Sequence, residues 1–585
     1  MTHTSGEEFE QLRLPIGEDD YKELIRKKCV YIDKTLLIKE FWEDGSKVFL
    51  VTRPRRFGKS IALSMLCYFF EKPAFEKPAS SHSYLFEQSA IWKYEEFRKI
   101  QGTYPVIFIS FKDIKRKSWE DSYEELKNLL AKEVYRTLNP LEPQMDDYHR
   151  RKYELLIKKT ANVAEFSESL LFITEVFKKH YNENTIILID EYDSPITHAY
   201  IQDFYEEMTD FMRQVLSKAL KSNVHLHKGV MTGVVRTSKD GILSGLNNLK
   251  ICTMLDKNFS DKFGFTQNEV EELLQKVGRL DKKEEVKTWY NGYVIGAEYL
   301  SDSSTSHLSV SVYNPWSILN YLEGSIFPKT YWVRTGSVTL LEKLISLADE
   351  TIQQELKVLM EGHFLENKEI NQDVILLDLD KKKLEPWSFL FFAGYLTATK
   401  HIFQNDRNYY RLSIPNKEIA ELYKDLVLGS IYHTFDSVQL KKLMDALITG
   451  NIDEVSFLLK EFIVSLCSFH DLPYNDLERS LHMFVLGLLA SLSDRFVIKS
   501  NLESGIGRYD ILMHPKKEGD PAIVIEFKKG KNLKLEKLAD QALEQIKTGQ
   551  YEHILKDYGY KGKVFCYGVA CFKKHLIAKI QIEKI

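Results

Sequence analysis

The chain has few of the features that mark secreted, membrane-spanning or zinc-binding proteins. Only six of its 585 residues are cysteines, and no two of them form a C-x-x-C pair, which argues against a zinc site or a disulfide framework. No run of eighteen apolar residues occurs, and the N-terminus lacks a basic stretch followed by an apolar core, so neither export nor membrane spanning is indicated. We expect a cytoplasmic protein with reduced, mostly buried thiols.

A strong charge of one sign is also missing. The net charge is −4, so the molecule as a whole does not attract nucleic acid, and any contact with a phosphate backbone must use local basic patches. Two such patches occur, at residues 112–117 and 528–537. Taken alone, each is typical of a solvated face or loop. The second draws more attention because it follows a strand with catalytic character, considered below.

A phosphate-loop signature lies between a short apolar strand, 47–52, and an apolar stretch with the length of a buried helix, 61–70. Gly58, Lys59 and Ser60 give the loop its ending. In such loops backbone N–H groups and a helix N-terminus cradle phosphate oxygens, the lysine reaches the β- and γ-phosphates, and the hydroxyl ligates magnesium. The sequence therefore predicts a nucleotide site here.

The match departs from the full pattern at its first position, where Arg53 replaces glycine. A bare G-K-S would be a chance occurrence in most proteins, so the surrounding sequence has to decide. Beyond Gly58, Lys59 and Ser60, the nucleotide contacts that we expect from this loop are Arg56, Phe57 and Ile61.

A second buried-strand pattern, 185–191, ends in two acids. We expect Asp190 to hold the magnesium shell and Glu191 to orient or deprotonate the attacking water. A strand ending in acids is ordinary by itself, but together with the loop it predicts binding of ATP and Mg²⁺. A third strand, 229–235, leaves two interpretations open: Thr232 or Arg236 senses the γ-phosphate, or both belong to a strand-end turn.

The middle of the chain is aromatic and helical. An aromatic cluster could stack on bases, but core packing is favoured because no lysine or arginine is interleaved with its members, which are Trp289, Tyr290, Tyr293, Tyr313 and Trp316. From 384 to 419 an apolar helix is followed by a strand pair, as in a winged helix. Its recognition elements are poor in basic residues, so packing or relay between domains is favoured over DNA contact.

Near the C-terminus an apolar helix beginning at 477 precedes three expected strands, the last of which is 522–528. Side chains alternate along a strand, so Glu526 and Lys528 share a face, and Asp510 on the neighbouring strand can meet them there. Two carboxylates can hold Mg²⁺, with Mn²⁺ as an alternative, while the lysine positions the nucleophile or stabilises charge on phosphorus. This set predicts metal-dependent cleavage of phosphodiester bonds.

Two helices flank the candidate site, one with Glu478 and the other with Gln541. Glu478 lies one turn before His482 on the expected helix, and its role as a metal ligand stays open, whereas a histidine at such a position more often packs. Gln541 lies four residues before Gln545 on the following amphipathic helix, so both can face the site. A surface ion pair would explain an isolated E-x-K strand, but not the ordered set with Asp510 and Gln541.

These residues also carry a family resemblance. The chain resembles AAA-like ATPases that are commonly fused to a C-terminal PD-(D/E)XK nuclease-like domain, a family in which arginine also replaces the first glycine of the loop. The resemblance implies an ATPase of the extended AAA or signal-transduction type with a RecA-like core. The motifs that carry it are YIDKT at 31–35, FLVTRPRRFGKS at 49–60, ILIDEYDSPI at 187–196, SGLNNL at 244–249, FGFT at 263–266, WYNGY at 289–293, YNPWS at 313–317 and AGYLT at 393–397.

The expected fold is α/β and multidomain, as the length of the chain and its 44% hydrophobic content allow. It has a RecA/AAA-like P-loop core, a helical lid, a winged-helix-like middle region and a C-terminal PD-(D/E)XK nuclease-like domain. The expected segments are a leader at 1–20, the ATPase core at 21–264, the lid at 265–345, the winged-helix-like region at 346–430, a helical connector at 431–475 and the nuclease-like domain at 476–585.

Two functions follow, from different classes. The first is an ATP-binding and ATP-hydrolysing protein that regulates a magnesium-dependent nuclease domain. The second is an ATP-driven switch or scaffold that binds a protein or nucleic-acid partner through an inactive nuclease-like domain. The intact Asp510, Glu526 and Lys528 favour the first. We expect nucleic acid, DNA or RNA, as the partner, and no membrane. Self-association into a homo-oligomer is left open.

Overall fold

In the computed structural model, the chain folds into two compact units. The first unit comprises Met1–Gly336 and Glu366–Glu418, and the second comprises Ser337–Leu365 and Ile419–Ile585. The structure describes residues 13–72, 82–221, 223–236, 243, 246, 248–300, 306–324, 327–332, 341, 350–372, 386–432, 437–469, 492, 495–504, 507–530, 534–548, 551–572 and 575–585.

The N-terminal part of the first unit is built on a five-stranded parallel sheet with the strand order β2-β3-β4-β1-β5. Short, β-branched, apolar runs form these strands, and β1 and β3 are buried along their whole length because helices cover both faces. The sequence correctly predicts three of the strands. The bounds are β1 Val48–Thr52, β2 Val106–Ser110, β3 Thr185–Asp190, β4 Leu226–Gly233 and β5 Leu249–Cys252.

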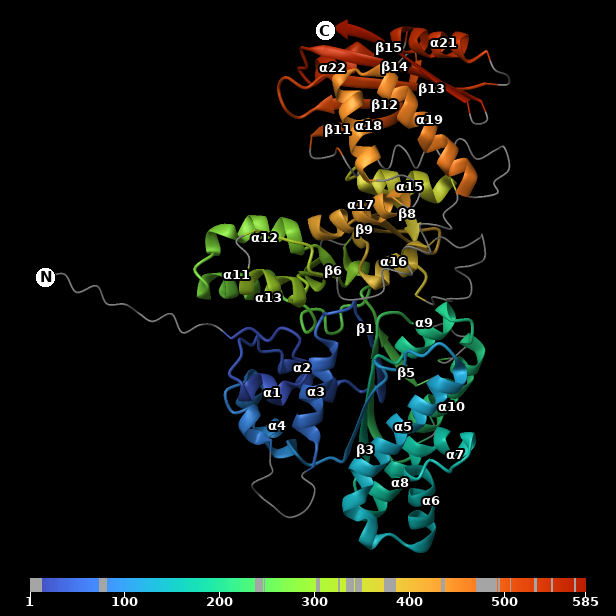
Figure 1. Ribbon diagram of the computed structural model, residues 1–585. Coiled ribbons are helices and arrows are strands. Elements are labelled where there is room, and N and C mark those ends of the chain that lie inside the picture. Colours follow the sequence, from blue (N-terminus) through green and yellow to red (C-terminus); the bar gives the residue numbers. More distant parts are fainter. Residues whose placement is uncertain are drawn as a thin grey trace, which may run out of the picture. The chain divides into compact units, whose positions relative to one another are not determined.

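Helices cover both faces of this sheet, with α1–α4 on one side and α5–α10 on the other (Figure 1). The bounds are α1 Tyr21–Arg26, α2 Leu36–Glu43, α3 Lys59–Phe70, α4 Glu95–Ile100, α5 Trp119–Leu138, α6 Asp147–Ile157, α7 Val163–Ser167, α8 Ser169–Tyr181, α9 Ser194–Ile201 and α10 Tyr205–Leu220.

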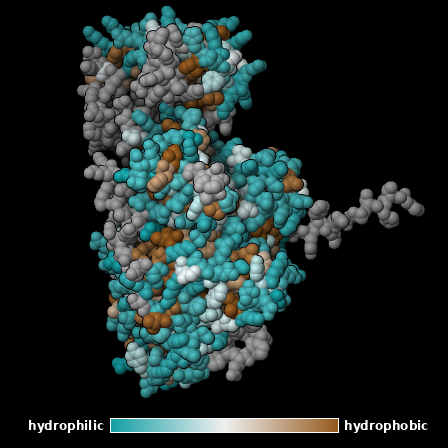
Figure 2. All heavy atoms as spheres, turned by 180° about the vertical axis from the view of Figure 1, so that it is seen from behind, coloured by the Kyte–Doolittle hydropathy of each residue, from teal (hydrophilic) through white to brown (hydrophobic). Residues whose placement is uncertain are grey.

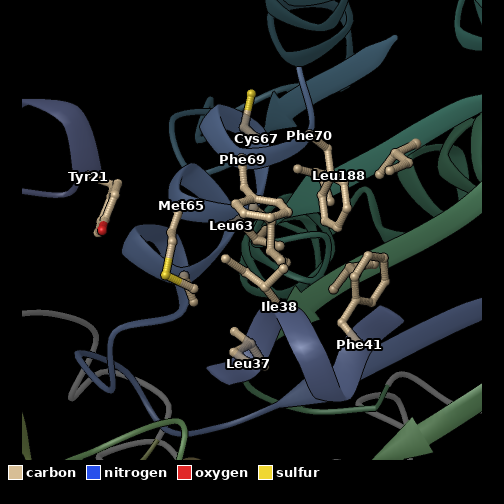
Figure 3. Packing of buried hydrophobic residues seen from close by; sticks show 14 of the residues in the cluster. Tyr21, Leu37, Ile38, Phe41, Leu63, Met65, Cys67, Phe69, Phe70 and Leu188 are labelled. Atoms are coloured by element: carbon tan, nitrogen blue, oxygen red, sulfur yellow. The ribbon is translucent and has the colours of Figure 1, made fainter. Parts of the chain in front are cut away.

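Helix α3 is apolar on nearly every side because it is enclosed between the sheet and other helices. Figure 3 shows Leu63, Phe69 and Phe70 of α3 among Ile38 and Phe41 of α2, and all five belong to one buried cluster. Burying an apolar side chain of this size contributes roughly 1.5–3 kcal/mol. This packing fixes the start of α3, and with it the loop that precedes the helix.

The rest of the first unit contains helices α11, α12 and α13, where a helical lid is expected, and beyond them a helix followed by a strand pair. The strand pair belongs to a three-stranded sheet with the order β8-β10-β9, and β6 pairs with β7. The comparison with a winged helix stays an interpretation. The bounds are α11 Gln267–Lys276, α12 Lys283–Tyr290, β6 Tyr293–Ile295, β7 Val310–Val312, α13 Pro315–Gly324, β8 Leu365–Glu369, α16 Trp387–Ala393, β9 Thr397–Gln404 and β10 Arg407–Ser413.

The second unit is centred on a five-stranded sheet with the order β11-β12-β13-β14-β15. Its first three strands are antiparallel, and β14 then pairs parallel with β13 after a crossover through α21. The bounds are α15 Glu350–Met360, α17 Lys417–Tyr432, α18 Ser437–Thr449, α19 Ile452–Phe469, β11 Phe496–Ser504, β12 Gly507–Pro515, β13 Ala522–Lys529, α21 Leu535–Thr548, α22 Tyr551–Asp557, β14 Lys563–Phe572 and β15 His575–Lys584.

The surface is mixed in character. On the face seen in Figure 2, hydrophilic residues predominate and hydrophobic residues form scattered patches. Within the described parts of the chain, no helix combines the length and the apolar character needed to cross a membrane.

Candidate functional site

The phosphate loop connects β1 to α3. Gly58, at φ +83°, caps the helix in a left-handed conformation that glycine adopts without strain. Lys59 follows as the first residue of α3, and its Nζ donates hydrogen bonds to the carbonyl oxygens of Arg53 (3.0 Å) and Pro54 (2.9 Å). The loop thus wraps around its own lysine. The helix α3 begins at the end of the loop, and the N-terminus of a helix is suited to binding anions.

Lys59 is only 5% exposed, although it carries a charge. Burial lowers the pKa of its amine, while the nearby carboxylates of Glu191, Asp190 and Asp193 act in the opposite direction. A buried ammonium is costly unless anions face it. The site is therefore electrostatically prepared for a negatively charged ligand.

Asp190 joins the loop to the neighbouring strands. Its Oδ2 accepts a hydrogen bond from Ser60 Oγ at 2.6 Å, and its Oδ1 accepts one from Thr232 Oγ1 at 2.5 Å. The carboxylate lies at the C-terminal end of β3 and is 1% exposed. A hydroxyl and a carboxylate in contact form the oxygen pair that magnesium uses in phosphate-loop enzymes. These donors fit the metal.

Glu191 follows directly and has a left-handed backbone, with φ +50°. Such a conformation is uncommon for a non-glycine residue and is found preferentially at functional sites. Glu191 lines the same cavity as the loop. Asp193 has a supporting role, because its Oδ2 accepts from the backbone N–H groups of Val234 (2.8 Å) and Val235 (3.0 Å), which fixes the chain just after β4.

Arg53, at the position of the missing first glycine, does not face a ligand. Its side chain is completely buried, and its guanidinium donates to the carbonyl oxygens of Thr52 (2.8 Å), Cys252 (2.9 Å) and Asn258 (3.0 Å). It also lies over the ring of Phe263. Burial lowers the pKa of Arg53 to about 10. The arginine therefore ties the end of β1 to β5 and to the loop beyond it.

Restoring the missing glycine with Arg53→Gly is expected to destabilise the protein, not to improve nucleotide binding. Hydrogen bonds from a charged donor contribute roughly 1.5–3 kcal/mol each, so we expect a loss of about 2–4 kcal/mol after the cost of burying the charge is offset. A fall in the thermal unfolding midpoint measures it. Arg56→Gly is the matched control, since Arg56 is exposed and has φ +65°. Tighter ATP binding by Arg53→Gly at unchanged stability would contradict this role.

A cavity of about 400 Å³ opens beside the phosphate loop. Residues from several parts of the sequence line it: α1 with the segments before and after it, the phosphate loop with the start of α3, the segment after β2, the residue that follows β3, the segment before α11, and α13. Its charged and polar lining residues include Asp19, Lys34, Arg55, Arg56, Lys59, Ser60, Lys112, Lys115, Glu191 and Lys262. The positive side chains outnumber the negative ones here, as a polyphosphate ligand requires.

Two tryptophans from the middle of the chain contact the phosphate loop. The Arg56 guanidinium lies 4.3 Å from the ring centroid of Trp316, and the Arg55 carbonyl oxygen accepts a hydrogen bond from Trp332 Nε1 at 3.0 Å. Tyr290 and Tyr313 are fully buried, as core packing predicts. The contact of Trp316 with the loop had no sequence signal, because about 260 residues separate the partners.

The second candidate site lies on β13. Glu526 is 4% exposed, and its Oε1 is 3.5 Å from Lys528 Nζ, so the two side chains share one face of the strand. Lys528 also donates to Gln545 of α21. Gly568 of β14 is the in-register neighbour of Glu526, and a Cβ there would lie 2.4 Å from the Ala539 carbonyl oxygen. The glycine therefore lets α21 approach the face that carries the carboxylate.

Comparison with known proteins finds a family model that matches each region. Residues 15–243 match the model of a family described as a predicted AAA-ATPase, and residues 476–580 match the PD-(D/E)XK nuclease superfamily. The chain joins an AAA-ATPase-like domain to a PD-(D/E)XK nuclease-like domain. A protein of Azotobacter chroococcum mcd 1, described as an uncharacterized protein in the vnfD 5′ region, is 26% identical over 459 residues, which is 78% of each chain.

The AAA-ATPase-like domain contains the predicted nucleotide residues, and the cavity brings six of them together: Arg56, Phe57, Gly58, Lys59, Ser60 and Ile61. Asp190 and Thr232 lie behind them, bonded to each other. Among the described residues, Arg236 does not line the cavity. The basic segment containing Lys112 and Lys115, expected only as a solvated loop, does line it.

The structure describes fewer of the predicted site residues in the nuclease-like domain. Glu478 and His482 lie outside the described residues, and so does the side chain of Asp510, although this position belongs to β12. Of the two glutamines on α21, Gln545 contacts Lys528, whereas Gln541 is exposed. Helical periodicity alone cannot rank residues four apart, because they share a face.

Proposed function

We propose that this protein binds and hydrolyses ATP in its N-terminal part and thereby regulates a magnesium-dependent nuclease in its C-terminal domain. The observation that carries the proposal is the hydrogen-bonded group of Ser60, Asp190 and Thr232 beside the buried Lys59, at a cavity lined by Glu191. It is supported by the matches to an AAA-ATPase-like and a PD-(D/E)XK nuclease-like family.

In the proposed ATP reaction, Lys59 leaves its loop carbonyls for the β- and γ-phosphates, and backbone N–H groups at the start of α3 bind phosphate oxygens. Ser60 and Asp190 would hold Mg²⁺, which neutralises charge developing on the transferred phosphoryl group. Glu191 orients the attacking water and receives its proton as the bond to the leaving oxygen breaks. Thr232 keeps the Asp190 carboxylate oriented through its 2.5 Å hydrogen bond.

In the proposed cleavage reaction, Glu526 and Lys528 act on one phosphodiester. Strand register supports Asp510 as the third member: the pairs 511–525, 512–524 and 513–523, continued by one residue, would set position 510 opposite 526. Asp510 and Glu526, with Glu478 as a further candidate, would hold Mg²⁺ or Mn²⁺, which would activate water for attack on phosphorus while the bond from phosphorus to the leaving oxygen breaks. Lys528 stabilises the charge that accumulates there, and Gln545, with Gln541 as the alternative, orients the amine. Nucleic acid is then the expected partner.

Regulation is supported by a chain of contacts within the first unit. The Arg55 carbonyl oxygen accepts from Trp332 Nε1, and the backbone N–H of Trp332 donates to Glu418 Oε1 at 2.7 Å. Glu418 is fully buried, also accepts from Ser317 Oγ (2.7 Å), and has a pKa raised to about 7 by burial.

Glu418 belongs to the first turn of α17, and the residues of this helix from Ile419 onward belong to the second unit. A change in the phosphate loop that alters the Trp332 contact would therefore act on the helix that leaves the unit. A ligand shifts such an equilibrium only by its differential free energy of interaction with the two states. We propose that the contacts from Arg55 to Glu418 differ between the two nucleotide states and supply this free-energy difference.

The nuclease assignment is tested by cleavage of a mixed DNA and RNA substrate with Mg²⁺ or Mn²⁺. Glu526→Ala is expected to reduce cleavage at least about 100-fold, because a metal ligand is lost. Glu544→Ala, at an exposed position of α21, is the control and is expected to retain the wild-type rate. Cleavage unaffected by Glu526→Ala would reject the nuclease. Metal-independent binding of nucleic acid without cleavage by the wild type would favour the scaffold function instead.

A further inference from the structure

An ion pair forms part of the lining of the nucleotide cavity. Lys112 Nζ lies 2.6 Å from Asp19 Oδ2, and both residues line the cavity. Asp19 lies just before α1, whereas Lys112 lies 93 residues later in the segment after β2. The pair therefore links two segments that the phosphate loop itself does not hold together, and neither residue has a part in the reaction outlined above.

Lys112 is near the hydrolytic end of the cavity. Ser110, the last residue of β2, is the register partner of Asp190, and the backbone N–H of Phe111 donates to the Asp190 carbonyl oxygen at 3.0 Å. Lys112 is the next residue. Its segment thus leaves the sheet at the edge where Asp190 and Glu191 lie, which is the γ-phosphate end of a bound triphosphate because Ser60 and Asp190 are the magnesium donors.

Lys112 can exchange its carboxylate partner for a phosphate at little cost in stability. Its side chains are 44% and 55% exposed, and a pair of this kind contributes little to stability because water screens it. The hydrogen bond to Asp19 raises the pKa of Lys112 above its ordinary value. A terminal phosphate offers more acceptor oxygens and more charge than one carboxylate, and charge-assisted hydrogen bonds to phosphate are strong.

We propose that Lys112 recognises the γ-phosphate, and that Asp19 holds it in the nucleotide-free protein and loses it when a triphosphate binds. The inference rests on the ATP site proposed above. It gives the protein a preference for ATP over ADP, because only the triphosphate reaches Lys112. It also makes the contact between Asp19 and the segment after β2 dependent on the nucleotide.

The test is calorimetric titration of the full-length protein with ATPγS and with ADP, each with Mg²⁺. Lys112→Met is expected to weaken ATPγS binding roughly tenfold and to change ADP binding less than about twofold. Lys112→Arg is expected to retain the preference because the positive charge remains. Lys99→Met is the matched control, since Lys99 forms an exposed 2.8 Å ion pair with Glu95 outside the cavity lining.

A double variant of Asp19 and Lys112 tests whether Lys112 exchanges Asp19 for the γ-phosphate. Asp19→Asn is expected to tighten ATPγS binding in the wild-type background and to have no effect when Lys112→Met is also present. An equal loss for ATPγS and ADP in Lys112→Met, or a selective loss in Lys115→Met instead, would overturn this inference while leaving the ATP site intact. Failure of the wild type to bind either nucleotide would overturn the ATP site itself, and this inference with it.

Discussion

Lys59→Ala is expected to abolish detectable ATP binding. The amine is 5% exposed, is held by the carbonyls of Arg53 and Pro54, and is the cation that faces three carboxylates. Its removal takes away the charge that would meet the β- and γ-phosphates and leaves those carboxylates to repel the ligand. Loss of one hydrogen-bonded buried charge of this kind costs roughly 2–5 kcal/mol of binding free energy, or about 30- to 5,000-fold in affinity. Equilibrium titration with a fluorescent ATP analogue measures it.

Glu191→Gln is the informative partner of that variant. It preserves the size of the side chain and removes the carboxylate that orients water, so we expect near-normal ATP affinity and a turnover at least about 100-fold lower. The backbone at 191 is left-handed, and glutamine tolerates it about as well as glutamate does. Unchanged ATP turnover in both Lys59→Ala and Glu191→Gln would reject the nucleotide site.

The second large effect is an asymmetry between the two candidate sites. Lys59→Ala is expected to change the rate of nucleic-acid cleavage, although Lys59 belongs to the first unit and Glu526 to the second. Glu526→Ala is expected to remove cleavage and leave ATP hydrolysis mostly intact, because its carboxylate serves only the C-terminal metal. The ATP site then affects cleavage, whereas the cleavage site does not affect ATP hydrolysis.

Trp332→Phe tests the connection and replaces none of the residues proposed to act in either reaction. It deletes the Nε1–H that donates to the Arg55 carbonyl oxygen at 3.0 Å and keeps an aromatic ring against Tyr395. We expect ATP hydrolysis and ATP-free cleavage close to wild type, with a smaller effect of ATP on cleavage. Trp316→Phe is the control, because Trp316 contacts the phosphate loop through its ring, and phenylalanine retains a ring over which Arg56 can lie.

The local elements of both candidate sites could be predicted because their signals are local. A β-rich apolar run, a G-K-S ending and an apolar helix are adjacent in sequence, and β1 and α3 form there. Asp190 and Glu191 could be paired with the loop because parallel strands end at one edge of a sheet. In the C-terminal domain, the period of two predicted that Glu526 and Lys528 share a face, and their 3.5 Å separation agrees with it.

What could not be predicted depends on contacts between distant residues. The sequence shows that Arg53 replaces the first glycine of the loop but not what the arginine does there, because its partners at Cys252 and Asn258 lie about 200 residues away. Lys112 reads as part of a solvated basic run, because its pairing with Asp19 has no periodicity that a sequence reveals. The choice between Gln541 and Gln545 depends on how closely α21 approaches the sheet, which the glycine at 568 determines.

The central claim is that nucleotide state in the first unit controls cleavage in the second. The most direct test is a paired assay of phosphate release and nucleic-acid cleavage on the wild type and Lys59→Ala, each with and without ATP in the presence of Mg²⁺. The account predicts a cleavage rate that depends on ATP in the wild type and not in Lys59→Ala. Equal cleavage by both proteins with and without ATP would contradict it, because the two activities would then merely share a chain.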